Sequence, residues 1–287
     1  MKRIYIFIYT VAALCVTLFA SCGGGEQTDH QTIYVSIAPL RPIVEGIVGD
    51  DFAVEVLVPA GASPETFEPT PKQFVALNRS RMIFGVGLLD FERALLDKVH
   101  DRTKVINLAR GIQTIAGTCS HTHHGAHCHH GVDPHVWCSP KQLMTMAENA
   151  FEAINAAMPD SLHYAENYNT LCARLLDLDE EVGEMCRCAP RSYFVIYHPA
   201  LTYFARDYGL EQIAIEDEGK EPSVKRLGEI IERARLDGTK RVFYQSEFPR
   251  STVEVICEDI GAEPVEINPL DENLFENLRE IARLITE

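Results

Sequence analysis

The twelve residues from Cys119 to His130 hold the densest metal-binding chemistry in the sequence, because six are histidine and two are cysteine. Imidazole and thiolate groups together suit zinc or copper, whereas manganese and magnesium prefer oxygen ligands. The irregular spacing and the lack of a hydrophobic period indicate a loop rather than one ordered tetrahedral site. We therefore expect an auxiliary metal-binding loop whose ligands are His121, His123, His124, His127, His129 and His130.

A candidate ligand, Glu65, precedes a predicted helix in the stretch Pro64–Gln73. Thr70 is a typical helix N-cap and Pro71 suits the first helical position, so the helix is expected to begin there. The aromatic residue Phe67 follows Glu65 by two positions. The carboxylate is therefore expected to lie in a loop-to-helix turn.

The stretch Asp133–Gln142 repeats this arrangement with a histidine. Ser139 is a candidate N-cap, Pro140 takes the first helical position, and Gln142 would complete a capping box. His135 then lies in a rigid turn before the helix, and an aromatic residue again follows it by two positions. Because the two turns match, we interpret the carboxylate of the first and His135 of the second as metal ligands at corresponding places in one lobe.

A second candidate histidine, His198, directly follows the apolar run Tyr193–Tyr197 and precedes Pro199. Such a run predicts a strand, and the carboxyl ends of parallel strands are where open α/β sheets bind ligands. We therefore interpret His198 as a site residue rather than as a structural histidine.

Strand-like runs alternate with helix-like runs in both halves of the chain. In the first half the expected strands are Ile33–Ala38, Ala53–Val58, Met82–Val86 and Lys104–Asn107, separated by helices such as Pro71–Arg79 and Phe91–Val99. In the second half they are Tyr193–Tyr197, Gln212–Ile215, Arg241–Tyr244 and Pro264–Ile267. This alternation favours parallel sheets covered by helices. The predicted fold class is α/β, with two four-stranded parallel-sheet lobes.

The pattern changes between the two halves. Lys141–Met158 predicts one helix, and Ser161–Arg187 contains neither proline nor a strand-like run. As a single helix the second stretch would span roughly 40 Å, enough to reach from one lobe to the other. We therefore expect an N-terminal lobe at residues 32–158, a connecting helix at 159–188 and a C-terminal lobe at 189–287.

Residues 1–21 have the pattern of a lipoprotein signal peptide. Two basic residues precede the apolar run Ile4–Phe19, which is shorter than the ~20 residues that a membrane-spanning helix needs. Small residues then precede Cys22, and three glycines follow it. We expect Cys22 to carry lipid, residues 22–31 to form a flexible tether, and the protein to be anchored in the cell envelope.

The net charge of the chain bears on which partners it can bind. The net charge is −16, and removal of the signal peptide takes away two positive charges and leaves −18. Such a field repels nucleic acid and attracts cations, so we expect no nucleic-acid partner.

Seven cysteines lie outside the signal peptide and the lipidation position, and their pairing stays open. They are Cys119, Cys128, Cys138, Cys172, Cys186, Cys188 and Cys257.

These motifs together resemble the metal-binding solute-binding proteins of ABC importers, the zinc and manganese group, and especially its zinc type with a histidine-rich loop. The segments that carry the resemblance are Pro64–Gln73, the histidine-rich loop, Asp133–Trp137, His198–Leu210, Glu218–Ser223 and Asn268–Leu270. The resemblance covers nearly the whole chain after the signal peptide. It implies two α/β lobes joined by a long helix, with metal held in the cleft by residues of both.

The resemblance also implies that His135 and His198 are ligands. The family usually has histidine where this chain has Glu65, and aspartate where it has Asn268. The expected metal set is Glu65, His135, His198 and Asn268, with Asn268 as a weak or absent donor because its amide oxygen is uncharged. Two other residues, Asp271 and Glu247, stay open as substitutes for it. Two imidazoles and one carboxylate suit zinc and also manganese.

The predicted function is extracytoplasmic capture of a divalent transition metal, zinc first, and its delivery to an ABC permease and its ATPase by a monomeric binding protein. One alternative is a manganese-specific protein of the same group, and another is a surface adhesin or metal store. A zinc hydrolase is disfavoured, because no His-Glu-x-x-His motif is present. We therefore expect no enzymatic activity.

Overall fold

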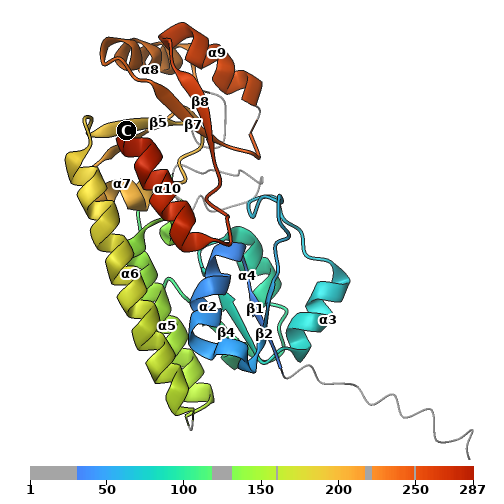
Figure 1. The fold of residues 1–287 in the computed structure, drawn as a ribbon. Coiled ribbons are helices and arrows are strands. Elements are labelled where there is room, and N and C mark those ends of the chain that lie inside the picture. Colours follow the sequence, from blue (N-terminus) through green and yellow to red (C-terminus); the bar gives the residue numbers. More distant parts are fainter. Residues whose placement is uncertain (1–30, 118–130, 160, 217–221, 249) are drawn as a thin grey trace, which may run out of the picture.

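The computed structural model describes residues 31–117, 131–159, 161–216, 222–248 and 250–287 (Figure 1). The predicted signal peptide, Cys22, most of the tether, the histidine-rich loop and the start of the motif Glu218–Ser223 lie outside the described residues. Among the described residues, no helix combines the length and the hydropathy that crossing a membrane requires.

The first lobe is built on a parallel sheet with the strand order β2-β1-β3-β4. Its strands are β1 (Thr32–Val35), β2 (Ala53–Val56), β3 (Met82–Gly85) and β4 (Val105–Asn107). β2, β3 and β4 each fall within a predicted run but are shorter, whereas β1 begins one residue before its predicted run and ends earlier. The chain after β1 turns into a short 3-10 helix, Ala38–Leu40. Val35 of the central strand β1 pairs with Val56 on one side and Phe84 on the other.

Helices cover this sheet, as Figure 1 shows. They are α2 (Arg41–Val48), α3 (Pro71–Arg79), α4 (Asp90–Leu96) and α5 (Pro140–Ala157). Further 3-10 turns lie at Gly49–Asp51, Arg102–Lys104 and Val136–Cys138. The predicted start of α3 is confirmed, because the Thr70 hydroxyl accepts from the backbone of Gln73 and the Gln73 side chain accepts from the backbone of Thr70. This reciprocal box fixes the end of the loop that carries Glu65.

The second lobe repeats the topology with the strand order β6-β5-β7-β8, again all parallel. Its strands are β5 (Tyr193–Ile196), β6 (Glu211–Ala214), β7 (Arg241–Gln245) and β8 (Glu263–Ile267). Its helices are α7 (Thr202–Tyr208), α8 (Val224–Leu236), α9 (Arg250–Ile260) and α10 (Leu274–Thr286). The predicted fold of two four-stranded parallel sheets is therefore confirmed.

Helix α6 (Leu162–Cys188) is the predicted connector, and its 27 residues reach along both lobes (Figure 1). On the first lobe, Asn167 donates to the backbone carbonyl of Ile47 at 3.0 Å. Toward the second lobe, the Tyr208 hydroxyl donates to Asp179 at 2.6 Å, and Arg279 pairs with Glu181 at 2.6 Å. A helix held at both ends limits how the lobes move relative to each other.

Two apolar cores hold the molecule together. The larger one runs through the first lobe, α5, α6 and α10 and continues onto one face of the second sheet through Phe194, Ile196 and Phe243. The smaller one lies on the other face of that sheet, where Val195 and Val242 pack with α8 and α9. Because the larger core is shared, burial of apolar surface fixes the second sheet against the first lobe.

Candidate metal centre

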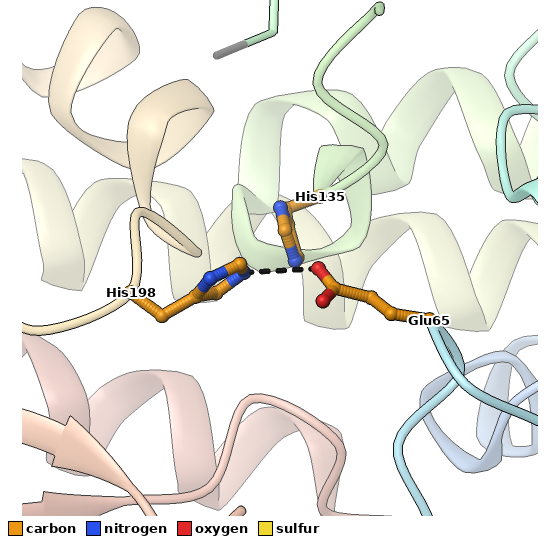
Figure 2. A group of neighbouring side chains, drawn as sticks. All are labelled: Glu65, His135 and His198. Carbon is orange, nitrogen blue, oxygen red and sulfur yellow. Dashed lines mark ion pairs between the residues drawn. The ribbon is translucent and has the colours of Figure 1, made fainter. Parts of the chain in front are cut away.

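Three side chains from distant parts of the chain converge where the two lobes meet. One ligand atom each of Glu65, His135 and His198 lies within 4.8 Å of the other two. His198 Nε2 is 3.2 Å from Glu65 Oε1, and Figure 2 shows the three side chains pointing toward one another. The structure therefore brings together three of the four cleft residues that the sequence predicted as ligands.

Glu65 lies in the loop between β2 and α3. The capping box at Thr70 fixes the end of this loop, and the Gln73 amide also donates to the backbone carbonyl of Leu57 at 2.9 Å. Nearer the site, the Glu65 backbone N–H donates to the Ser63 hydroxyl at 3.2 Å. The Glu65 side chain keeps 25% of its surface exposed, so it is the most accessible of the three candidate ligands.

His135 is buried directly before the turn Val136–Cys138, and Asp133 holds it in place. One oxygen of Asp133 accepts from both the backbone N–H and the ring Nδ1–H of His135, each at 2.9 Å. Burial disfavours the Asp133 carboxylate, but His135 outweighs it, so the pKa of this carboxyl lies below its usual range. With Nδ1 engaged, Nε2 is the nitrogen left for a metal.

His198 follows β5 and is held in the same way by a carboxylate. Its Nδ1 is 2.8 Å from Glu216 Oε2, and Glu216 comes two residues after the end of the neighbouring strand β6. Burial alone would lower the pKa of His198, but hydrogen bonds that its ring donates to Glu216 and Glu65, together with their negative charges, raise it to about 9. The negative field that favours the imidazolium also favours a divalent cation at this point.

Aromatic rings close the centre on two sides. The Phe248 ring stacks on His198 with centroids 5.0 Å apart, and Trp137 lies 5.2 Å from His135. The Trp137 indole N–H donates to the Pro269 carbonyl at 2.9 Å, which ties the turn of the first lobe to the chain after β8. These contacts fix the imidazoles before any ion arrives, which favours tight binding.

The predicted capping box at the start of α5 is wrong. The Ser139 side chain caps nothing and instead donates to Asp207 Oδ2 at 2.6 Å, and the Gln142 amide donates to the same oxygen at 2.6 Å. The Asp207 carboxylate, whose side chain is 9% exposed, outcompetes a local cap because charge-assisted hydrogen bonds are stronger. The turn that carries His135 is therefore held by α7 of the second lobe as well as by its own helix.

The three candidate ligands line a cavity of about 40 Å³. Its remaining walls are Ser63, Pro64, Leu89, Trp137, Ala200, Gln245, Glu247, Phe248, Pro269 and Leu270. Such a volume holds an ion with a small number of waters. Both sheets contribute to these walls from the loops after their strands, where ligand sites of open α/β sheets form.

The structure does not bring Asn268 to the three candidate ligands. Asn268 is exposed, lines a neighbouring hollow rather than the cavity, and its side-chain oxygen accepts from the Leu270 backbone at 3.0 Å. Asp271 lies in the same hollow, and its carboxylate accepts from the Asn273 backbone at 2.8 Å. Of the candidates for a fourth ligand, Glu247 alone lines the metal cavity as well as the neighbouring hollow.

The sequence did not predict the residues that hold the candidate ligands in place or complete the wall of the cavity. Asp133 had a usable signal, because it lies two residues before His135 in the same turn. The only sequence signal for Glu216 was its position just after a predicted parallel strand, which is the same kind of position that identified His198. Phe248 and Gln245 carried no local signal, because only the sheet topology brings them to the cavity.

Two imidazoles and one carboxylate, each imidazole backed by a further carboxylate, make a donor set suited to zinc with one position open for water. The molecule is thus a two-lobed α/β protein with a candidate metal centre between its lobes. The chain belongs to the family described as ZnuA, zinc-uptake complex component A periplasmic, whose sequence model matches residues 33–287.

Curated relatives and solved structures agree with this assignment. The chain is 27% identical over 284 residues to the zinc-binding lipoprotein AdcA of Streptococcus pneumoniae (strain ATCC BAA-255 / R6), covering 94% of this chain and 56% of AdcA. It is 26% identical over 280 residues to the high-affinity zinc uptake system protein ZnuA of Bacillus subtilis (strain 168), covering 91% and 87%. The chain therefore spans slightly more than half the length of AdcA.

A crystal structure of a ZnuA deletion mutant with zinc bound is similar to this fold with a TM-score of 0.81 and 33% identity. The match covers 90% of this chain and 97% of that one. A match over 90% of this chain is too long to lie within one lobe, so the similarity extends over both lobes.

Proposed function

We propose that this chain captures zinc outside the cytoplasm and delivers it to an ABC-type importer. One observation carries the proposal: Glu65, His135 and His198 converge within 4.8 Å at the meeting of two lobes, and each imidazole is backed by a buried carboxylate. A catalytic zinc site needs room for a substrate beside the ion. A site that captures the ion needs only fixed donors and a way to release it. The family consists of metal-binding solute-binding proteins, and we propose no catalytic function.

The division of the ligands between lobes provides a route for release. Glu65 and His135 belong to the first lobe, and His198 follows the first strand of the second. Separation of the lobes by a permease would therefore remove one imidazole from the set and lower its affinity. A permease and its ATPase are accordingly the proposed partners, and the protein is proposed to act as a monomer.

The donor chemistry supports zinc as the cargo. Two nitrogen donors favour zinc over manganese, which prefers a shell richer in oxygen. The closed aromatic walls and fixed imidazoles suit the low coordination numbers that zinc accepts. The histidine-rich loop, outside the described residues, is proposed to collect further zinc near the cleft.

The proposed place of the protein is the outer side of a membrane. The signal peptide at residues 1–21 and lipid on Cys22 would anchor it, with the glycine-rich tether between the lipid and the first lobe. The relatives named as lipoproteins support this proposal.

The test is metal analysis of protein purified without added metal, followed by competition between zinc and manganese. We expect zinc to be retained and to displace manganese from the cleft. A surface histidine gives a matched control, because His163 also pairs with a carboxylate, Asp51, at 2.9 Å but belongs to no group of three metal-binding side chains among the described residues. Loss of the preference for zinc in His198→Ala, but not in His163→Ala, would support the cleft. Preferential retention of manganese by the unchanged protein would refute the proposal.

A further inference from the structure

Gln245, the last residue of β7, is a buried amide in the wall of the metal cavity. It is 3% exposed, and its Nε2 donates to the backbone carbonyl of His198 at 3.0 Å. Its Oε1 is also buried and has no hydrogen-bond partner among the described residues. A buried polar atom without a partner is uncommon in a folded protein and calls for a physical reason.

The contact made by Nε2 does not explain why an amide is present. The same carbonyl of His198 already accepts from the Ala200 backbone N–H at 2.8 Å. The ring of His198 is oriented separately, through Nδ1 and Glu216. An apolar side chain of similar length would fill the place of Gln245 and leave no group unpaired, so the feature that needs an amide is the oxygen.

The metal ligands suggest what this oxygen is for. Three protein ligands leave a fourth position on zinc, which water takes in open sites. Zinc polarises that water and makes its O–H groups strong hydrogen-bond donors. An uncharged amide oxygen accepts such a bond without adding negative charge to a centre that already holds three carboxylates, those of Glu65, Asp133 and Glu216.

We propose that Gln245 Oε1 accepts a hydrogen bond from the water that completes the zinc shell of Glu65, His135 and His198. This inference rests on the proposed function and assigns the fourth position to a water held by the second lobe. Gln245 is thus a positioning residue that acts on the ion through water. Its amide couples the ion to β7, while Nε2 keeps the oxygen next to the backbone of a ligand.

Two variants separate the two ends of the amide. Gln245→Met removes both the acceptor and the donor, whereas Gln245→Glu keeps oxygen acceptors and removes the donor to the His198 carbonyl. We expect Gln245→Met to raise the zinc Kd on the order of tenfold, the effect of one hydrogen bond. Gln245→Glu should bind zinc at least as tightly as the parent. Equal weakening in both variants would assign the role to Nε2 and overturn the inference.

The stability of the metal-free protein distinguishes a role in zinc binding from a purely structural role of Gln245. Because Gln245→Met removes an unpaired buried oxygen, the melting temperature without metal should stay the same or rise while zinc affinity falls. Gln212→Met is the matched control, since the Gln212 amide has both of its ends paired at 2.8 Å, with the Leu201 backbone and the Thr202 hydroxyl. It should lose stability and keep its zinc affinity.

The measurements are zinc titration against a competing chelator and thermal unfolding without metal, on the full chain. A Gln245→Met protein that melts at a lower temperature and binds zinc as tightly as the parent would show that the amide is structural. Absence of tight zinc binding in the parent itself would instead refute the proposed function, so the two failures are distinguishable.

Discussion

Two hollows lie side by side between the lobes and share Glu247 and Leu270 in their walls. The metal cavity is small, about 40 Å³, and its imidazoles are buried, whereas the neighbouring hollow measures about 330 Å³ and holds Asn268 and Asp271. Both contain oxygen donors, and the larger hollow contains more acidic side chains. Acidic content alone therefore does not distinguish a metal site.

The two hollows differ in the hydrogen-bond partners of their polar side chains. In the neighbouring hollow, Asn268 and Asp271 satisfy their oxygens with backbone N–H groups two residues further on. In the metal cavity, each imidazole is held through Nδ1 by a carboxylate, and its second nitrogen converges with Glu65. Donors that are fixed on one side and open on the other are prepared for an ion before it arrives.

The largest expected effect follows from removing one of these fixed donors. His198→Ala should weaken zinc binding by more than about a hundredfold, because the loss of outer partners alone accounts for about 10- to 100-fold. Calorimetric titration measures the change, with His163→Ala as the control. Binding of His198→Ala within a few fold of the parent would place the tight site elsewhere.

A smaller loss is expected when the partner of the imidazole is changed instead. Glu216→Gln removes the charge and lets an amide N–H face Nδ1 of His198, which favours the wrong ring tautomer. Zinc affinity should fall by about 10- to 100-fold. Glu211→Gln is the control and should bind like the parent, because Glu211 begins the strand that leads to Glu216 but pairs at the surface with Arg233 at 2.7 Å. Equal affinity of both variants would contradict the role of Glu216.

Deletion of residues 119–130 should change stoichiometry rather than the tight site. The deleted protein is expected to bind fewer zinc ions but to keep one tight site, since the three converging ligands all lie outside the loop. Metal analysis after dialysis counts the ions. Loss of all tight binding would make the loop, and not the cavity, the main site.

The smallest effect is expected in the neighbouring hollow. Asn268→Ala should leave zinc affinity nearly unchanged, because the Asn268 oxygen is occupied by the Leu270 backbone and the side chain lies outside the cavity. The substitution should lower the free energy of unfolding by about 1 kcal/mol, because one hydrogen bond is lost. Thermal unfolding and zinc titration of the same sample separate the two quantities. A marked fall in affinity would mean that Asn268 turns inward when metal binds.

The sequence predicts well those features that depend on local pattern. Alternating strands and helices define two parallel sheets, and a threonine followed by proline marks the start of α3. Glu65, His135 and His198 were recognisable because each lies in a turn or directly after a strand, where α/β folds gather ligands. Their convergence follows from the topology that those patterns specify.

Features that depend on contacts between distant segments were not predictable. Ser139 has the sequence of a cap but binds Asp207, 68 residues further along the chain. Gln245 gives no local sign of its place in the cavity, and Glu216 meets His198 only because β5 and β6 are neighbours. Asn268 was expected from family resemblance, and Pro269 beside it does line the cavity, but a local turn directs its side-chain oxygen to the backbone.

The most direct test of the central claim is calorimetric zinc titration of Glu65→Ala and Asn268→Ala, both in protein lacking residues 119–130. The loop deletion leaves the cavity as the only proposed zinc site, so each change in Kd reports on one hollow. We predict that Glu65→Ala weakens binding by more than about tenfold, since a charged ligand is lost, while Asn268→Ala binds like the parent. Tight binding by Glu65→Ala together with weak binding by Asn268→Ala would contradict this assignment of the metal centre.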